Sequence, residues 1–377
     1  MDVLATLLAK CFGADEGSGD SLLWDVGLRP HALGDYSIAA VQANSTLEDQ
    51  AQVFTSPSSI YIGVYDGHGG PQASRFISDH LFSSLHEFTM EYNGLTKDVI
   101  KKAFNATEEG FIRLVKKSYA SHPQLATVGS CCLVGAISNG VLYVANLGDS
   151  RAVLGTKISG DTSTSSVVAE RLSTDHNVSV EEVRKEVKAL HPDDSHIVVF
   201  TRGVWRIKGI IQVSRSIGDL YLKRPDVLVD RSIQRCHSLP LKRPVVTAEP
   251  SMVVRTLRPH DLFLIFASDG FWEHLTDEMA VDLVAKSQRQ GVAKRLVIAA
   301  LKVAAAKLRM QYNDIKTIEK GLRRCFHDDI SVVVMYLDRP GNSDRSFRSC
   351  SSVDCIGVPP DIFSINSDQA RQSPLYP

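Results

Sequence analysis

Short apolar stretches alternate along this chain with longer stretches in which apolar residues recur every three or four positions. The short stretches are rich in Val, Ile, Tyr and Phe and are bounded by Gly, Asn, Asp or Ser, a pattern typical of β-strands. The Asn139-Gly140 pair between two of them predicts a tight hairpin, and therefore an antiparallel sheet. The predicted strands cover residues 36–42, 59–65, 130–137, 141–147, 262–267 and 330–337.

The longer stretches predict helices between the strand pairs. Ile77, Leu81 and Leu85 would share one helical face. Ser179 and Glu182 form a capping box, which predicts the start of another helix. The helical stretches run over residues 77–88, 99–114, 179–190, 276–287 and 292–310. Because strand pairs alternate with helix pairs, we expect an α+β fold of two packed antiparallel sheets with helices outside, not a doubly wound parallel sheet.

Composition divides the chain into three parts. Residues 1–34 form a mixed N-terminal leader, and residues 35–338 read as one continuous globular domain. Residues 339–377 are rich in Ser, Asp, Pro, Asn and Gln, which predicts a flexible C-terminal tail.

Charge and cysteine usage narrow the setting in which the protein works. The 377 residues include 42 basic and 43 acidic side chains, so we expect no nucleic-acid partner. The seven cysteines have no metal-ligand spacing and fit a reduced intracellular compartment. No segment approaches the roughly 20 apolar residues that a membrane span requires.

Acidic residues recur where apolar strands begin or end. Asp66 follows one predicted strand, Asp149 and Asp269 follow two others, and Asp328 precedes the last. If these ends meet, several carboxylates share a small volume, and a hard divalent cation would relieve their repulsion. Oxygen ligands without His or Cys clusters favour Mg²⁺, Mn²⁺ or Ca²⁺ over zinc. A single Asp-Gly pair is most often only a turn, but turns explain four such acids poorly.

Six short motifs surround these acids, at residues 47–49, 65–70, 148–151, 213–219, 267–272 and 327–331. Their residues and their order along the chain resemble the type 2C (PPM) family of metal-dependent protein phosphatases. The resemblance implies a four-layer α-β-β-α sandwich with metal ions between the sheets, and it makes residues 35–338 the catalytic domain. It also implies hydrolysis of phosphoserine and phosphothreonine through a metal-bridging hydroxide.

The resemblance assigns roles to individual residues. Asp66 would bridge two ions, Mg²⁺ or Mn²⁺, and the carbonyl of Gly67 would bind the second ion. Asp269 and Asp328 would complete the protein ligands of the first ion. His68 would be the general acid for the leaving serine or threonine oxygen; a lone histidine could be structural, but its place within the metal motif favours the catalytic role.

Other acidic positions would play weaker parts. The resemblance implies that Glu48 holds the second ion, largely through water, with support from Asp49. Asp149 and Glu273 match positions that can hold a weaker third ion, but Glu273 stands where an aspartate is usual. Asn44 stands where the family usually has an arginine that binds the substrate phosphate, so the phosphate-binding residue stays open.

Two stretches, 42–50 and 204–212, resemble a plant subgroup of the family. That subgroup includes phosphatases that negatively regulate plasma-membrane proton pumps. Small auxin-induced proteins inhibit the phosphatases of this subgroup. The resemblance therefore implies a monomer with phosphorylated protein substrates, such a pump among them, and with such inhibitors as partners. It would work in the cytoplasm, in the nucleus or at the plasma membrane. Residues 190–208 would form a substrate-facing flap or, equally, a solvated loop.

Two other functions compete with this interpretation. A phosphatase-like binding module would lack a metal-bridging acid, whereas Asp66, Asp269 and Asp328 are all present. A metallohydrolase of small phosphoesters has the same ligand chemistry, and only its turnover of peptides and metabolites would separate it. No cysteine is followed six residues later by the arginine of a cysteine-based phosphatase, and no phosphate-binding P-loop occurs.

Overall fold

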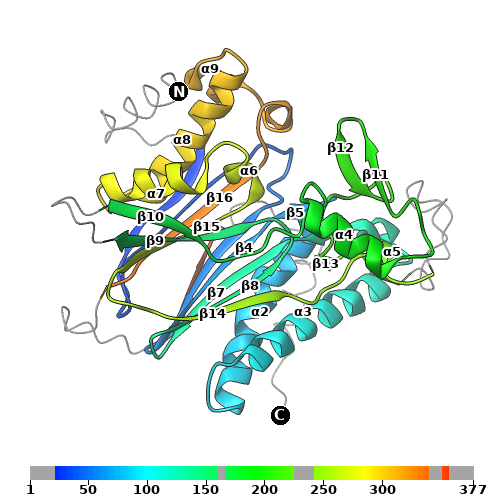
Figure 1. The fold of residues 1–377 in the computed structure, drawn as a ribbon, viewed down its shortest axis with the longest axis horizontal. Helices are drawn as coiled ribbons and strands as arrows, with labels where there is room; N and C mark the ends of the chain where they lie inside the picture. Colours follow the sequence, from blue (N-terminus) through cyan, green and yellow to red (C-terminus); the bar gives the residue numbers. More distant parts are fainter. Residues whose placement is uncertain (1–21, 159–165, 225–241, 339–349, 356–377) are drawn as a thin grey trace, which may run out of the picture.

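Two antiparallel sheets form the centre of the molecule (Figure 1). The computed structural model describes residues 22–158, 166–224, 242–338 and 350–355. The first sheet has the order β1 (Leu23–Arg29), β2 (Tyr36–Val41), β16 (Ile330–Tyr336), β15 (Asp261–Ala267), β9 (Arg151–Ile158) and β10 (Ser166–Arg171). The second has the order β14 (Ser251–Thr256), β8 (Val141–Leu147), β7 (Cys132–Ser138), β4 (Ser59–Tyr65), β3 (Gln50–Thr55) and β17 (Ser351–Asp354).

The central strands are buried on both faces, which explains why they read as continuous apolar runs. Successive side chains of a strand point to opposite faces of its sheet. In β2, Ala39 and Val41 pack towards the helices, whereas Ile38 and Ala40 pack between the sheets. The same alternation runs through β15 and β4, so the two sheets share one apolar layer.

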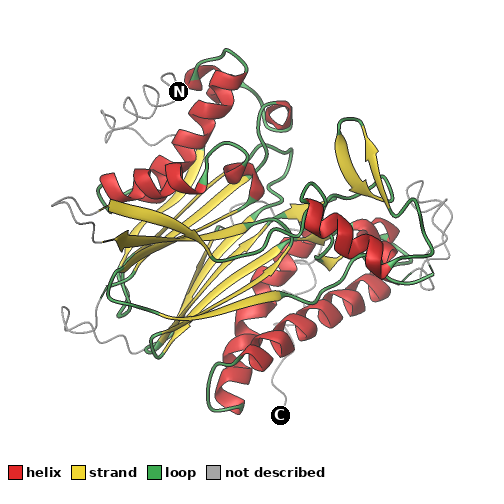
Figure 2. Cartoon of the chain, viewed as in Figure 1, coloured by secondary structure: helices red, strands yellow, loops and turns green. Residues whose placement is uncertain are grey.

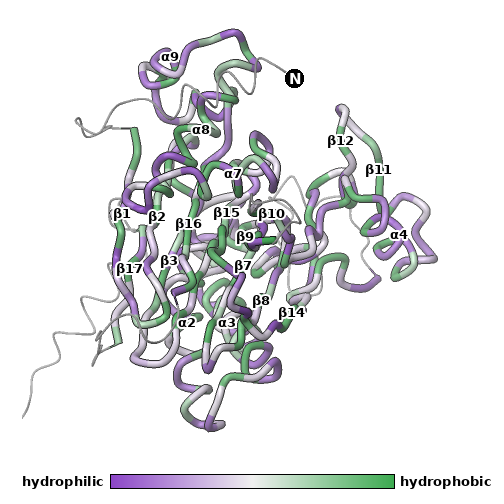
Figure 3. Tube along the Cα trace, turned by 60° about the vertical axis from the view of Figure 1, so that its left-hand side comes forward, coloured by the Kyte–Doolittle hydropathy of each residue, from purple (hydrophilic) through white to green (hydrophobic). Residues whose placement is uncertain are grey.

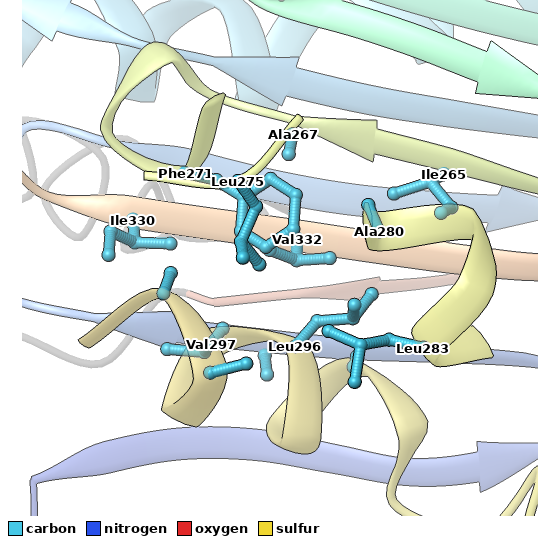
Figure 4. Packing of buried hydrophobic residues seen from close by; sticks show 14 of the residues in the cluster. Ile265, Ala267, Phe271, Leu275, Ala280, Leu283, Leu296, Val297, Ile330 and Val332 are labelled. Carbon is cyan, nitrogen blue, oxygen red and sulfur yellow. The ribbon is translucent and has the colours of Figure 1, made fainter. Parts of the chain in front are cut away.

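Helices cover the outer face of each sheet (Figure 2). The second sheet is covered by α2 (Gln72–Glu91) and α3 (Lys97–Ser118), and the first by α7 (Asp277–Lys286) and α8 (Val292–Lys307). The side chains of Thr96 and Thr276 cap α3 and α7 by accepting a backbone N–H from the first turn of each helix. Figure 4 shows α7 and α8 packing against β15 and β16. These layers confirm the predicted four-layer sandwich.

Smaller elements surround this core. A short sheet joins β13 (Ile217–Gly218), β6 (Gly129–Ser130) and β5 (Gly67–His68). The hairpin of β11 (Val198–Thr201) and β12 (Val204–Ile207) packs with α4 (Glu181–Leu190) around a separate small core. The other helices of the described residues are η1 (Pro123–Thr127), α5 (Leu220–Lys223), α6 (Asp269–Trp272), α9 (Tyr312–Thr317) and η3 (Leu322–Cys325). Figure 3 shows hydrophobic residues along the central strands and hydrophilic ones around the periphery, including α9.

Several details differ from the sequence-based expectations. The helix predicted after Ser179 begins at Glu181 with Val180 as its cap residue, and no side chain caps it. The strand predicted over 130–137 is interrupted at Cys131, which separates β6 from β7. Strand β1 lies within the predicted leader, and β17 lies within the predicted tail. Residues 1–21, 339–349 and 356–377 lie outside the described part.

Within the described residues, no helix combines the length and the apolar character that crossing a membrane would require.

Candidate active site

Carboxylates from both sheets converge at one end of the sandwich. Asp66 follows β4 and Glu48 precedes β3 in the second sheet, whereas Asp269 follows β15 and Asp328 precedes β16 in the first. Burial raises the pKa of Asp66 and the negative charge of Asp269 raises it further, so the two carboxylates lie close to each other. Because the two sheets face each other, residues that are far apart in sequence share one site.

The backbone around Glu48 is packed against the strand end that carries Asp66. A methyl group added to Gly67 would lie 2.5 Å from the carbonyl oxygen of Glu48, so only glycine fits this position. The same carbonyl accepts a hydrogen bond of 2.5 Å from the hydroxyl of Ser74, which belongs to α2. The backbone of Glu48 is therefore held beside that of Gly67.

Asp329 organises the loop that leads to Glu48. Its Oδ1 accepts the backbone N–H groups of Ala43 at 2.6 Å and of Asn44 at 3.1 Å. Its Oδ2 accepts the N–H of Glu48 at 2.7 Å. Because Asp329 is buried, these donors fix the loop on the first sheet. The sequence predicts no role for Asp329, because two neighbouring aspartates do not show which of their carboxylates faces the loop that leads to Glu48.

Asp49 lies behind the cluster and joins the two sheets. It is buried, and the hydroxyl of Ser268 donates to its Oδ2 at 2.7 Å. The same hydroxyl accepts the backbone N–H of Ser331 at 3.0 Å. Asp49 therefore ties the start of β3 to the end of β15 and the start of β16.

The carboxylates of the cluster have raised pKa values, because their negative charges are buried close to one another. Burial, reinforced by repulsion from neighbouring carboxylates, raises the pKa of Asp66, Asp269 and Asp49 well above the usual value. Burial raises the pKa of Asp328 to about 6, although Arg324 opposes that change. Burial and the charges of Asp329 and Asp328 raise the pKa of Glu48 to about 7, against the opposing effect of His68 and Arg324.

These carboxylates fit a divalent cation site. They provide hard oxygen ligands, and their mutual repulsion would be relieved by bound cations. Asp66, Asp269, Asp328 and Glu48 are each partly exposed, so an ion can reach them. Carboxylate oxygens of this kind suit a hard divalent cation such as Mg²⁺, Mn²⁺ or Ca²⁺ better than zinc.

A second acidic group extends the cluster through Asp149. Ligand atoms of Asp66, Cys131 and Asp149 lie within 4.8 Å of one another. The Cys131 thiol donates to Oδ1 of Asp149 at 3.3 Å, and the Asn177 amide donates to its Oδ2 at 2.6 Å. Burial and the charge of Asp149 raise the pKa of Asp269, and Glu273 lies close enough for its own charge to raise this pKa further. Cys131 was missed because its sequence neighbours carry no metal-ligand spacing.

His68 is paired with a buried aspartate that the sequence analysis left without a role. Its Nε2 lies 2.8 Å from Oδ2 of Asp219, and the hydroxyl of Ser216 donates to the same oxygen at 2.6 Å. Burial would lower the pKa of His68, but the charge and hydrogen bond of Asp219 raise it above the usual value. A methyl group on Gly129 would lie 2.3 Å from Asp219 Oδ2 and 2.5 Å from His68 Nε2, so glycine leaves room for the pair.

Asn44 points its side chain at the cluster. Its amide Nδ2 donates to Oδ1 of Asp328 at 3.3 Å. Two cationic side chains of the predicted flap, residues 190–208, have partners outside this cluster. Arg206 donates to the carbonyl of Ile210 at 2.6 Å, and Lys208 pairs with Asp194.

Comparison with known proteins identifies the family of the chain. The model of the family "Protein phosphatase 2C" matches residues 42–311. The chain is 64% identical over 373 residues to the Arabidopsis thaliana protein "Probable protein phosphatase 2C 63", covering 99% of this chain and 98% of that relative. It is 60% identical over 358 residues to "Probable protein phosphatase 2C 78" of Oryza sativa subsp. japonica, covering 94% and 91%.

Solved structures share the fold. The serine-threonine phosphatase 2C of Toxoplasma gondii superposes with a TM-score of 0.62 at 15% identity, covering 84% of this chain and 99% of that one. A Caenorhabditis elegans sex-determining protein superposes with a TM-score of 0.57 at 18% identity, covering 84% and 66%. By its sequence over almost its full length, the chain belongs to the protein phosphatase 2C family and is a metal-dependent protein serine/threonine phosphatase.

Proposed function

We propose that Asp66, Asp269, Asp328 and Glu48, with the carbonyl of Gly67, hold two divalent cations, Mg²⁺ or Mn²⁺. The observation that carries this proposal is the convergence of partly exposed carboxylates with raised pKa values at the ends of β4, β15 and β16. When bound, such ions lower the pKa of a water molecule and neutralise charge on a transferring phosphoryl group.

The protein's own residues prepare the leaving group. We propose that His68 donates a proton to the departing serine or threonine oxygen, which would otherwise leave as a strongly basic alkoxide. Asp219 accepts the Nε2–H of His68 and fixes the ring orientation, so Nδ1 is the nitrogen left to face the substrate. Ser216 donates to Asp219, and this bond keeps the buried carboxylate in place.

Asp149 and Glu273 extend the proposal to a third, weaker ion. Asp149 shares the space of Asp66 and Cys131, while Glu273 is exposed beside Asp269. An exposed glutamate at this position binds an ion less firmly than a buried aspartate, because its longer side chain loses more conformational freedom.

Partners and location follow from the resemblance to the plant subgroup. We propose that the substrates include a phosphorylated plasma-membrane proton pump and that small auxin-induced proteins inhibit the enzyme. The protein would act as a monomer in the cytoplasm, in the nucleus or at the plasma membrane. Dephosphorylation of a pump phosphopeptide, measured with and without such an inhibitor, tests both partners together.

The metal-site proposal is tested with the purified full-length chain on a phosphothreonine peptide. Turnover should require added Mn²⁺ or Mg²⁺ and should stop with EDTA. Asp66→Asn and Asp269→Asn should each abolish turnover while circular dichroism stays that of the unmodified protein. Full activity after exhaustive chelation, or in both variants, would contradict the proposed site. Faster turnover of phosphorylated metabolites than of peptides would favour a small-molecule phosphoesterase instead.

A further inference from the structure

The substrate phosphate also needs directional hydrogen-bond donors. The metal ions of the proposed site would neutralise much of its charge, and charge-assisted hydrogen bonds from a side-chain cation would orient it. Asn44 offers only a neutral amide, and that amide already donates to Asp328 at 3.3 Å. A cationic side chain elsewhere at the site could supply these hydrogen bonds.

Arg324 is the cation that the structure places at this point. Its Nη2 lies 2.6 Å from Oδ2 of Asp328, while Asn44 contacts Oδ1 of the same carboxylate. The two side chains thus approach one ligand carboxylate through its two oxygens. Among the ion pairs of the described residues, this one alone joins a lysine or arginine to Glu48, Asp66, Asp149, Asp269 or Asp328.

The segment that carries Arg324 is fixed to the loop of Asn44. The backbone N–H of Gly321 donates to the carbonyl of Ala43 at 2.8 Å. The buried guanidinium of Arg323 donates to the carbonyl of Gln42 at 3.2 Å and to that of Ile318 at 2.7 Å. Because Gly321 and Arg323, which precede Arg324 in this segment, hold its backbone on this loop, Arg324 begins from a defined position beside the site.

The guanidinium itself remains accessible. The side chain of Arg324 is 53% exposed, whereas that of Asp328 is 18% exposed. Exposed ion pairs contribute little to stability, so this contact is readily shared or exchanged when a phosphate arrives. A guanidinium has five N–H donors in a planar fork, which suits simultaneous contact with Asp328 and with two phosphate oxygens.

We propose that Arg324 binds the substrate phosphate. It would do so in place of the phosphate-binding arginine for which this chain has Asn44. Arg324 belongs to η3, shortly before β16, whereas Asn44 belongs to the loop between β2 and β3, so the two side chains reach Asp328 from different segments. An alternative is that Arg324 only neutralises Asp328. That role would alter metal binding and leave phosphate binding unchanged.

The two roles are separated with Arg324→Gln in the full-length, Mn²⁺-saturated enzyme. Loss of hydrogen bonds to a charged group predicts a rise in KM for p-nitrophenyl phosphate of about ten- to a hundredfold, with much less change in kcat. The dissociation constant of inorganic phosphate, measured by calorimetry, should rise by a similar factor. Arg113→Gln, an exposed arginine on the outer helix α3, is the matched control and should change neither quantity.

A second variant keeps the test decisive. Adding Asn44→Arg to Arg324→Gln should restore phosphate affinity, because a guanidinium then reaches the same carboxylate from the other loop. Unchanged phosphate affinity in Arg324→Gln, with a shifted Mn²⁺ requirement, would overturn the proposal in favour of charge neutralisation. Since the unmodified enzyme is measured alongside, a lack of Mn²⁺-dependent turnover there would instead disprove the metal-site proposal.

Discussion

At the scale of single residues, the pair of His68 and Asp219 shows how the fold prepares a proton donor. The two residues are 151 positions apart, yet they lie 2.8 Å from each other. Asp219 is fully buried and has a φ of 51°, a left-handed conformation that aspartate and asparagine tolerate better than most residues. The pairing depends on a short sheet in which β6 lies between β5 and β13.

This arrangement predicts the behaviour of Asp219→Asn. The variant keeps the size and the backbone conformation of the side chain but removes the charge that favours a protonated, correctly oriented His68. We expect kcat on a phosphothreonine peptide to fall by up to about a hundredfold, the lower end of what a general acid contributes. Turnover of p-nitrophenyl phosphate should fall much less, because its leaving group needs little protonation.

His68→Ala provides the comparison for that variant. If Asp219 acts through His68, the double variant should be no slower than His68→Ala alone, since the two changes remove one function. Equal losses on both substrates would show instead that Asp219 only supports the fold of the short sheet.

At the scale of elements, β17 changes how the C-terminal part is understood. It pairs with β3 from Ser351 opposite Thr55 to Asp354 opposite Gln52. The thiol of the following Cys355 is buried and contacts the backbone N–H of Ala51 at 2.9 Å. Strand β17 therefore covers the edge of the sheet beside the segment that carries Glu48 and Asp49.

Thiol labelling tests whether β17 stays on the sheet in solution. Burial raises the pKa of Cys355 to about 12, so its thiol is both inaccessible and protonated near neutral pH. We expect iodoacetamide at pH 8 to modify the exposed Cys350 and Cys325 rapidly and Cys355 slowly, as followed by peptide mass spectrometry.

The variant Val353→Pro should release Cys355 for labelling, since proline removes a backbone donor and disfavours a paired strand. Ser352→Ala, which keeps the backbone intact, is the control and should leave the protection in place. Labelling of Cys355 as fast as that of Cys350 in the unmodified protein would mean that β17 does not remain paired.

At the scale of the whole molecule, the carboxylates gathered between the two sheets make the stability of the metal-free protein depend on pH. The folded-state pKa values of Glu48, about 7, and Asp328, about 6, lie above those of unfolded carboxyl groups. The metal-free folded protein therefore binds more protons than the unfolded chain between about pH 4 and pH 7. In that window these two groups make the metal-free protein less stable as the pH rises.

Bound Mn²⁺ should reverse this trend, because ligand carboxylates must lose their protons before they bind the ion. We expect the rise in Tm on adding Mn²⁺ to be small at pH 5 and to grow towards pH 8. At a free ion concentration about 100 times its dissociation constant, binding contributes about 2.7 kcal/mol. Thermal melts across this pH range, with Asp66→Asn as the variant of weakened affinity, check the prediction. An increment that is independent of pH would contradict it.

The sequence by itself determined the class of fold and the type of chemistry. Buried strands require apolar residues on both faces, and such runs are visible without coordinates, as in β4, β8, β15 and β16. The ordered motifs around Asp66, Asp269 and Asp328 predicted the family, and the comparisons confirm that prediction. Edge strands such as β1, β10 and β17 were not predicted, because their partly exposed faces lack a continuous apolar pattern.

Only the tertiary structure decided which side chains share a space. Nothing in the local sequence indicates that Asp219 faces His68, that Asp329 gathers the N–H groups before Glu48, or that Arg324 lies opposite Asn44 across Asp328. Each of these contacts joins segments from different strands or loops. The physical reason is that hydrophobic patterning reports burial within one element, whereas a polar contact depends on how two sheets and their connecting loops come together.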